Sequence, residues 1–254
     1  MQTLALKLVL APSLVAGVSL AGRRWGASVA GLLAGLPIVA APVLFFLTIE
    51  QGAAFGARAA VSTTLGIVSL MSYCLTYAWS ARRAPWWLSM VLGWIAFLIC
   101  TVTLEGLSVG PIFAAAGAAC VLTATLSVMP PGAASSANVK PSWWDLPMRM
   151  MLTASLVLAL TAAAQLLGPR WSGLLTPFPI ATTVLATFAH RQGGPANAAR
   201  FLRGLLSGIY SFITFNLVVA LTIEPYGVAA AFSFGILCSL ALHAVLFAIF
   251  NRRR

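Results

Sequence analysis

Long apolar stretches, separated by short polar or turn-forming joints, fill almost the whole chain. Nine of them reach the roughly 20 mostly apolar residues that a membrane-spanning helix needs. The pattern therefore predicts an all-α polytopic membrane protein with about nine transmembrane helices. The expected helices are 4–22, 27–49, 58–79, 86–105, 110–129, 147–167, 173–190, 200–222 and 227–250.

Composition excludes a soluble globular domain. Of the 254 residues, 61% are hydrophobic and only 7% are charged, whereas a soluble domain carries roughly 25% charge. The cysteines lie inside apolar runs without paired spacing, so we interpret them as packing residues and expect neither a disulfide nor a metal site. The first helix is followed by Arg23-Arg24 in place of a cleavage site, which favours a retained helix over a signal peptide.

The basic residues predict the orientation of the chain. With nine crossings, Lys and Arg divide 12 to 3 between the two sides, and the positive-inside rule then places the N-terminus outside and the C-terminus in the cytoplasm. Membrane orientation also accounts for the net charge of +11 without nucleic acid as a partner. We expect a bacterial inner-membrane protein surrounded by the lipid bilayer, with homo-oligomerisation left open.

One stretch of the chain occurs twice. Residues 31–78 align with residues 173–220 at a constant offset of 142, with 15 identities in 48 positions and no gap. The matches include Pro37 with Pro179 and Arg58 with Arg200. An odd number of crossings separates the copies, so they are expected in opposite orientations. We predict two inverted four-helix repeats, 1–105 and 147–254, separated by a spacer helix, 106–129, and a cytoplasmic linker, 130–146.

The repeated prolines predict broken helices. Proline inside a helix removes a hydrogen bond and clashes with the carbonyl four residues back, and hydrocarbon offers no water to the freed carbonyl. Pro37 lies within the second expected helix, and Pro177 and Pro179 lie within the seventh. Interrupted helices at matching places in inverted repeats indicate the binding site of a secondary transporter. The alternative is a structural kink, which is common in membrane helices.

The third helix of each repeat carries a stripe of small and polar residues. Spacings of three and four residues put the stripe on one helix face. Such a stripe suits close helix packing, and it also suits a wall lining a solute pathway. The first copy contains Ser62, Gly66, Ser69, Tyr73 and Thr76, with Ser72 beside them; the second contains Gly204, Gly208 and Ser211, with Ser207, Tyr210 and Thr214 beside them.

Arg58 and Arg200 begin equivalent helices at opposite membrane faces. They are either surface anchors or guanidinium groups that attract an anionic solute at the two mouths of one pathway. Glu50-Gln51 and Gln192 precede them at matching places and are candidate binding residues. Glu50 is also a candidate partner for Arg58.

Few residues suit proton transfer or catalysis. His243 is the clearest titratable group within a span, and it is either a packed core histidine or a proton relay. His190 ends the seventh helix near the cytoplasm. The chain has no phosphate-binding loop, nucleophile elbow or metal motif, so we expect no enzyme activity, no catalytic residues, no metal and no cofactor.

The repeated unit resembles the GlpM-like family of small bacterial inner-membrane proteins. The residues that carry the resemblance are Gly173 to Pro179, Gln192-Gly193 and Arg200. It implies that each repeat is similar to one whole four-helix member, so that this chain is a fused two-copy form. The first copy departs from the pattern with Gly35-Leu36-Pro37.

The sequence therefore predicts a secondary transporter of a small, possibly anionic, solute. The solute would bind between the second, third, seventh and eighth helices. The alternative is a scaffold or assembly factor for a partner complex, suggested by the lack of an intramembrane carboxylate that would couple transport to an ion gradient. The candidate binding residues are Pro37, Glu50, Gln51, Arg58, Ser69, Ser72, Tyr73, Pro177, Pro179, Gln192, Arg200, Ser211 and Thr214.

Overall fold

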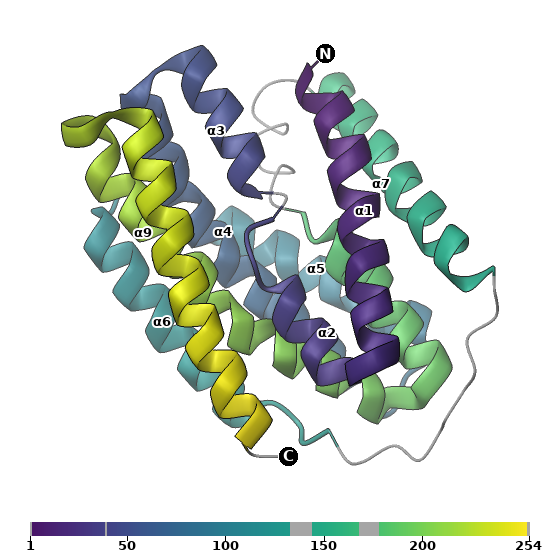
Figure 1. The fold of residues 1–254 in the computed structure, drawn as a ribbon. Coiled ribbons are helices and arrows are strands. Elements are labelled where there is room, and N and C mark those ends of the chain that lie inside the picture. The colour runs from purple at the N-terminus through teal and green to yellow at the C-terminus, as the bar shows by residue number, and fades with distance from the viewer. Residues whose placement is uncertain (1, 39, 133–143, 168–177, 253–254) are drawn as a thin grey trace.

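The computed structural model describes residues 2–38, 40–132, 144–167 and 178–252, and these residues form helices joined by short turns (Figure 1). The described part contains no strand. The helices are α1 (Gln2–Trp25), α2 (Ala27–Ala34), α3 (Ala40–Gln51), α4 (Ala53–Ser80), α5 (Trp86–Leu104), α6 (Pro111–Val128), α7 (Asp145–Leu167) and α9 (Ile180–Arg252).

The described residues form helices without strands, and the prediction of apolar helices of membrane-spanning length is confirmed for them. Within the described ranges, four helices are long and apolar enough to cross a membrane: α4, α5, α6 and the Ile180–Ile249 part of α9. Large apolar side chains cover much of the surface, as at Phe113, which is 78% exposed, and Leu237, which is 63% exposed. Hydrocarbon is the solvent that suits such a surface.

The helices run side by side in alternating directions. In Figure 1, α1 descends from the N-terminus at the top, α2 and α3 together rise, α6 descends, α7 rises, and the last part of α9 descends to the C-terminus at the bottom. The expected linker 130–146 ends slightly early, because α7 already begins at Asp145.

The break predicted at Pro37 is present. Residues 35–38 separate α2 from α3. The Gly35 amide closes α2 by donating to the Gly31 carbonyl, and the Ala41 amide opens α3 by donating to the Pro37 carbonyl. In the second copy, α9 begins at Ile180, directly after Pro179. Pro177 lies outside the described residues.

Two glycines divide α9 into three straight segments. Gly194 (φ 73°, ψ −176°) and Gly227 (φ 79°, ψ 170°) have non-helical backbone angles. We call the parts the half-helix 180–193, the segment 195–226 and the segment 228–252. Gly194 falls in the joint expected between 190 and 200, and Gly227 is the first residue of the expected helix 227–250. Gly52, which joins α3 to α4, has a similar conformation (φ 91°, ψ 166°) and lies 142 positions before Gly194.

Alanine at Gly194 is expected to destabilise the protein by about 1–3 kcal/mol, because residues with a side chain rarely adopt these backbone angles. Thermal unfolding of the detergent-purified protein measures the effect. Gly17→Ala is the matched control, since a Cβ there would meet nothing within 4 Å. Equal unfolding temperatures for the two variants would contradict a requirement for glycine at the bend.

The tightest packing joins α2 to the segment 195–226. A Cβ added at Gly31 would overlap the Phe201 carbonyl oxygen, and one at Gly204 would overlap the Ser28 carbonyl oxygen. Gly35 and Gly208 approach equally closely, since a Cβ at Gly35 would lie 2.7 Å from the Gly208 Cα. Small residues spaced by four let membrane helices approach to backbone contact. For Gly204 and Gly208, the packing interpretation of the stripe is therefore correct.

Candidate functional site

A row of polar side chains lies between α4 and the half-helix 180–193. The Trp94 indole Nε1 donates to the Thr183 hydroxyl at 3.1 Å, and the buried Tyr73 hydroxyl lies close to Thr183. About two turns further along the half-helix, the Tyr77 hydroxyl lies 3.3 Å from His190 Nδ1. Thr183 and His190 are seven residues apart, which puts them on one helix face.

Several hydroxyls near this row are buried without a hydrogen-bond partner. They belong to Ser69 and Tyr73 of α4 and to Thr187 of the half-helix. Ser69 and Tyr73 are 0% exposed. Tyr73 lies close to Thr183, and Thr187 lies close to Tyr77, without meeting hydrogen-bond geometry. A buried polar group without a good partner costs free energy.

The half-helix begins among aromatic rings. Phe178 packs against Trp94 and Phe97, with ring centroids 5.4 and 5.6 Å apart. Thr182 and Thr183 in its first turn are buried. The first amide groups of a helix have no intrahelical acceptor and carry a partial positive charge. At this start, the Ile180 amide donates to the Phe178 carbonyl and the Thr183 amide donates to the Pro179 carbonyl, both at 2.8 Å.

An ionic network lies at the other end of the half-helix. Asp145, at the start of α7, accepts from Arg23 Nη2 of α1 at 3.0 Å and from Arg149 Nε at 3.2 Å. The Arg149 guanidinium also donates to Ser19 at 3.3 Å and to the Gln192 side-chain oxygen at 2.8 Å, and Gln192 donates to Asp145. Both members of the Asp145–Arg149 pair are less than a tenth exposed. The network joins three elements that are distant in sequence.

The predicted residues of the first copy are divided between the interior and the surface. Pro37, Ser69 and Tyr73 are buried. Ser72 donates to the carbonyls of Ser69 and Ala96 and thereby ties α4 to α5. Three predicted residues are exposed near the joint between α3 and α4 and far from the polar row: Glu50, Gln51 and Arg58. Glu50 and Arg58, which the sequence left as an alternative pair, form no ion pair in the part of the chain that the structure describes.

The predicted residues of the second copy are likewise separated. Pro179 is buried before the half-helix, and Gln192 belongs to the ionic network. Arg200 is half-buried and donates to Asn197, with its Nε buried and unpartnered. Ser211 lies 3.2 Å from His243 Nδ1, and Thr214 donates to the carbonyl one turn before it.

Sequence reasoning missed Tyr77, Thr183 and Thr187. It used Arg149 only as one of the positive charges that predict the membrane orientation. Two signals were visible. Asp145 and Arg149 have the i, i+4 spacing of a helical ion pair, and Asp145 is the one acidic residue on the side with most of the cations. Thr183 and Thr187 also share a helix face directly after Pro179.

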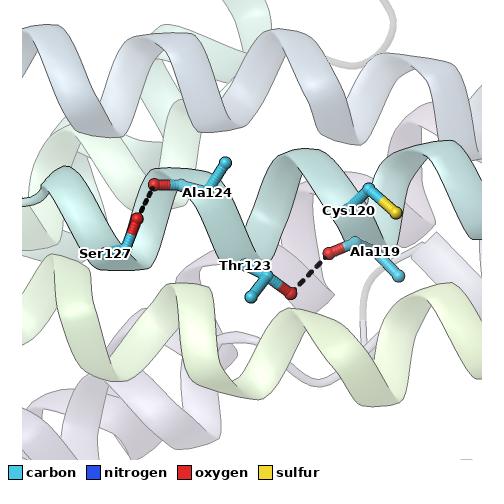
Figure 2. A pocket seen from close by; sticks show the side chains of 5 residues that line it. All are labelled: Ala119, Cys120, Thr123, Ala124 and Ser127. Atoms are coloured by element: carbon cyan, nitrogen blue, oxygen red, sulfur yellow. Dashed lines mark hydrogen bonds between the residues drawn. The ribbon is translucent and has the colours of Figure 1, made fainter.

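Two surface hollows lie elsewhere. One, of about 520 Å³, is an open groove along α6 lined by small residues, and Figure 2 shows them projecting from one face of that helix. The Thr123 and Ser127 hydroxyls there donate to carbonyls of their own helix. The other, of about 330 Å³, lies on α7 between Trp144 and Ser155. Neither contains a predicted site residue.

The polar row and the ionic network contain different chemical groups. Across the described ranges, no cluster of three His, Cys, Asp or Glu side chains lies close enough to hold a metal ion. The polar row provides hydroxyl, indole and imidazole groups without a fixed charge. The fixed charges lie at the ends of the bundle.

The chain is thus an all-helical protein with apolar helices of membrane-spanning length and a helix that begins in the interior beside buried hydroxyls. Comparisons with protein-family models, curated proteins and solved structures find no match to it. The resemblance to the GlpM-like family stays a prediction.

Proposed function

We propose that the protein is a secondary transporter of a small anionic solute across the bacterial inner membrane. The observation that carries the proposal is the start of the half-helix 180–193 inside the bundle. There the buried Thr182 and Thr183 form its first turn, and the Tyr73 hydroxyl lies close to Thr183. Interrupted helices with such ends bind solutes in transporters, and the positive end of a helix favours an anionic group.

Equivalent contacts at the offset of 142 support a two-repeat architecture. A Cβ at Gly93 of α5 would lie 2.8 Å from the Tyr73 ring, and one at Gly235 would lie 3.0 Å from the Phe215 ring. Gly93 and Gly235 are 142 positions apart, as are Tyr73 and Phe215. The same contact therefore recurs between the third and fourth helices of both proposed repeats, beyond the stretch in which the sequences align.

The distribution of charge supports the proposed orientation, with nine crossings and a cytoplasmic C-terminus. Arg23 and Arg149 meet at Asp145, and Arg203 donates to the Met129 carbonyl at the end of α6. In Figure 1, the ends of α1 and α6 and the start of α7 lie towards the end of the bundle where α9 finishes. Glu224 lies near the opposite end, before the bend at Gly227.

The solute is proposed to bind through neutral donors, with the arginines acting at a distance. Arg58 is exposed and Arg200 bonds Asn197, so neither lies in the polar row. They raise the local concentration of an anion at the two mouths by electrostatic attraction. At the centre, the helix end and the Ser69 and Tyr73 hydroxyls hold it.

His243 is the proposed proton-coupling group. Its Nδ1 pairs with Ser211, while its Nε2 is buried without a partner. Thr101 occupies the equivalent place in the first repeat, 142 positions earlier, and its hydroxyl is also buried without a partner. An ionisable residue within a membrane span is a candidate for coupling.

A ligand screen by thermal unfolding tests the transporter. The purified protein is heated with organic anions, amino acids, sugars, phosphate compounds and cations. We expect one anionic class to stabilise it, by about 2.7 kcal/mol at a hundredfold excess over Kd. The double variant Ser69→Ala/Tyr73→Phe, which keeps most of the side-chain volume, is expected to lose the effect, and Tyr226→Phe, at an exposed tyrosine, to retain it.

The alternative function is a scaffold or assembly factor for a partner complex. The absence of a carboxylate within the polar row favours it, because many coupled carriers use one. No stabilisation by any member of the panel, together with co-purification of a defined partner, would support the scaffold and contradict the transporter.

A further inference from the structure

The half-helix 180–193 is clamped on two faces at its cytoplasmic end. On one face, His190 meets Tyr77 of α4. On another, Gln192 meets Asp145 and Arg149 of α7, and the Arg149 guanidinium lies 4.6 Å from the centre of the Phe188 ring. The half-helix is bounded by Pro179 at one end and by the bend at Gly194 at the other, so it can turn as a unit once these contacts break.

We propose that the network of Arg23, Asp145, Arg149, Ser19 and Gln192 is a latch that closes the cytoplasmic end of the solute pathway. The proposal rests on the transporter function, because a latch has a role only where the pathway opens to alternate sides. Release of the latch frees the half-helix from α7 and exposes its hydroxyl face to the cytoplasm.

The chemistry of the network suits a latch better than a permanent brace. A buried ion pair adds little net stability compared with apolar packing, because desolvation offsets the attraction. Apolar residues would hold α1, α7 and α9 together equally well. Unlike charged and amide groups, however, they would not form hydrogen bonds with water when the helices separate. Polar groups can be solvated when the end opens, so the closed and open states can differ little in free energy.

Sequence equivalence predicts a second latch at the outer end. Glu50 and Lys7 are 142 positions before Gln192 and Arg149. Glu50 thus stands at the position of the Gln192 amide, and Lys7 stands at the position of the Arg149 guanidinium. Glu50 is exposed in this structure, which fits a state in which the cytoplasmic latch is the closed one.

Thiol labelling from the cytoplasmic side tests the latch. The reporter is Thr187→Cys, at a position that is 8% exposed, in inside-out vesicles of a chain with its native cysteines replaced by alanine. Gln192→Ala removes part of the network without leaving a lone buried charge. We expect it to raise labelling by a membrane-impermeant reagent at least about fivefold, because Gln192 makes two hydrogen bonds in the network and loss of one such bond shifts an equilibrium by about that factor.

Two controls separate a latch from general support of the fold. Arg82→Ala, at an exposed arginine stacked on Trp79, should leave the labelling of Thr187→Cys unchanged. A second reporter, Val219→Cys in the fully buried core, should stay unlabelled in the Gln192→Ala background. Unchanged labelling of Thr187→Cys, or labelling of both reporters, would overturn the latch. The readout needs no solute, so its failure is distinct from a failed ligand screen, which would count against the transporter.

Discussion

Alanine at Gly31 is expected to destabilise the protein by about 3 kcal/mol, at the upper end of the cost of overpacking. The added methyl group would overlap the Phe201 carbonyl oxygen, which is part of a helix backbone. Backbone cannot rotate away as a side chain can, so α2 and the segment 195–226 must separate. Loss of their close contact also weakens the attraction that joins these helices, since small-residue contacts drive helix association in membranes.

Thermal unfolding of the purified protein measures this effect, with an expected fall of roughly 6–12 °C for a chain of this size. Gly117→Ala is the matched control, because a Cβ at Gly117 of α6 would meet nothing within 4 Å. Alanine also favours helix over glycine, so the control should unfold at an equal or higher temperature. A Gly31→Ala protein as stable as the control would contradict the close packing of α2.

Removal of the Asp145 carboxylate is expected to cost about 3–5 kcal/mol, because it leaves buried positive charge without its counter-ion. Asp145→Ala strands Arg149, which is 8% exposed, and deprives Arg23 of its partner. Ser19 and Gln192 still solvate Arg149, but neither neutralises its charge. We expect a large fall in unfolding temperature and in the yield of monodisperse protein.

The double variant Asp145→Ala/Arg149→Met discriminates between lost charge balance and lost packing. It removes both charges and keeps an unbranched side chain at 149, so it should recover more than half of the lost stability. Glu224→Ala, at an exposed acid, should change stability little. If Asp145→Ala lowered the stability as little as Glu224→Ala does, the Asp145 carboxylate would not be a buried counter-ion.

The interrupted helix at Pro37 could be predicted from sequence because its cause is local. Proline has no backbone N–H, so it cannot donate the hydrogen bond of a continuous helix in any fold. The bends at Gly194 and Gly227 were equally visible as glycine-containing joints. The polar row was not, because the partner of Tyr77 is His190, over a hundred positions away. Nothing near Tyr77 in the chain distinguishes it from any other aromatic residue in an apolar helix.

Apolar length, proline and glycine act through the local backbone, so the sequence predicts most helices of the described ranges, their breaks at Pro37 and Gly194, and the charges at their ends. The contacts of each helix face follow from the three-dimensional arrangement. It assigned Gly204 and Gly208 to packing against α2, kept Arg58 on the surface, and brought Gln192 to Arg149 of α7. A helix presents several similar faces, and the choice among them depends on neighbours that are distant in the chain.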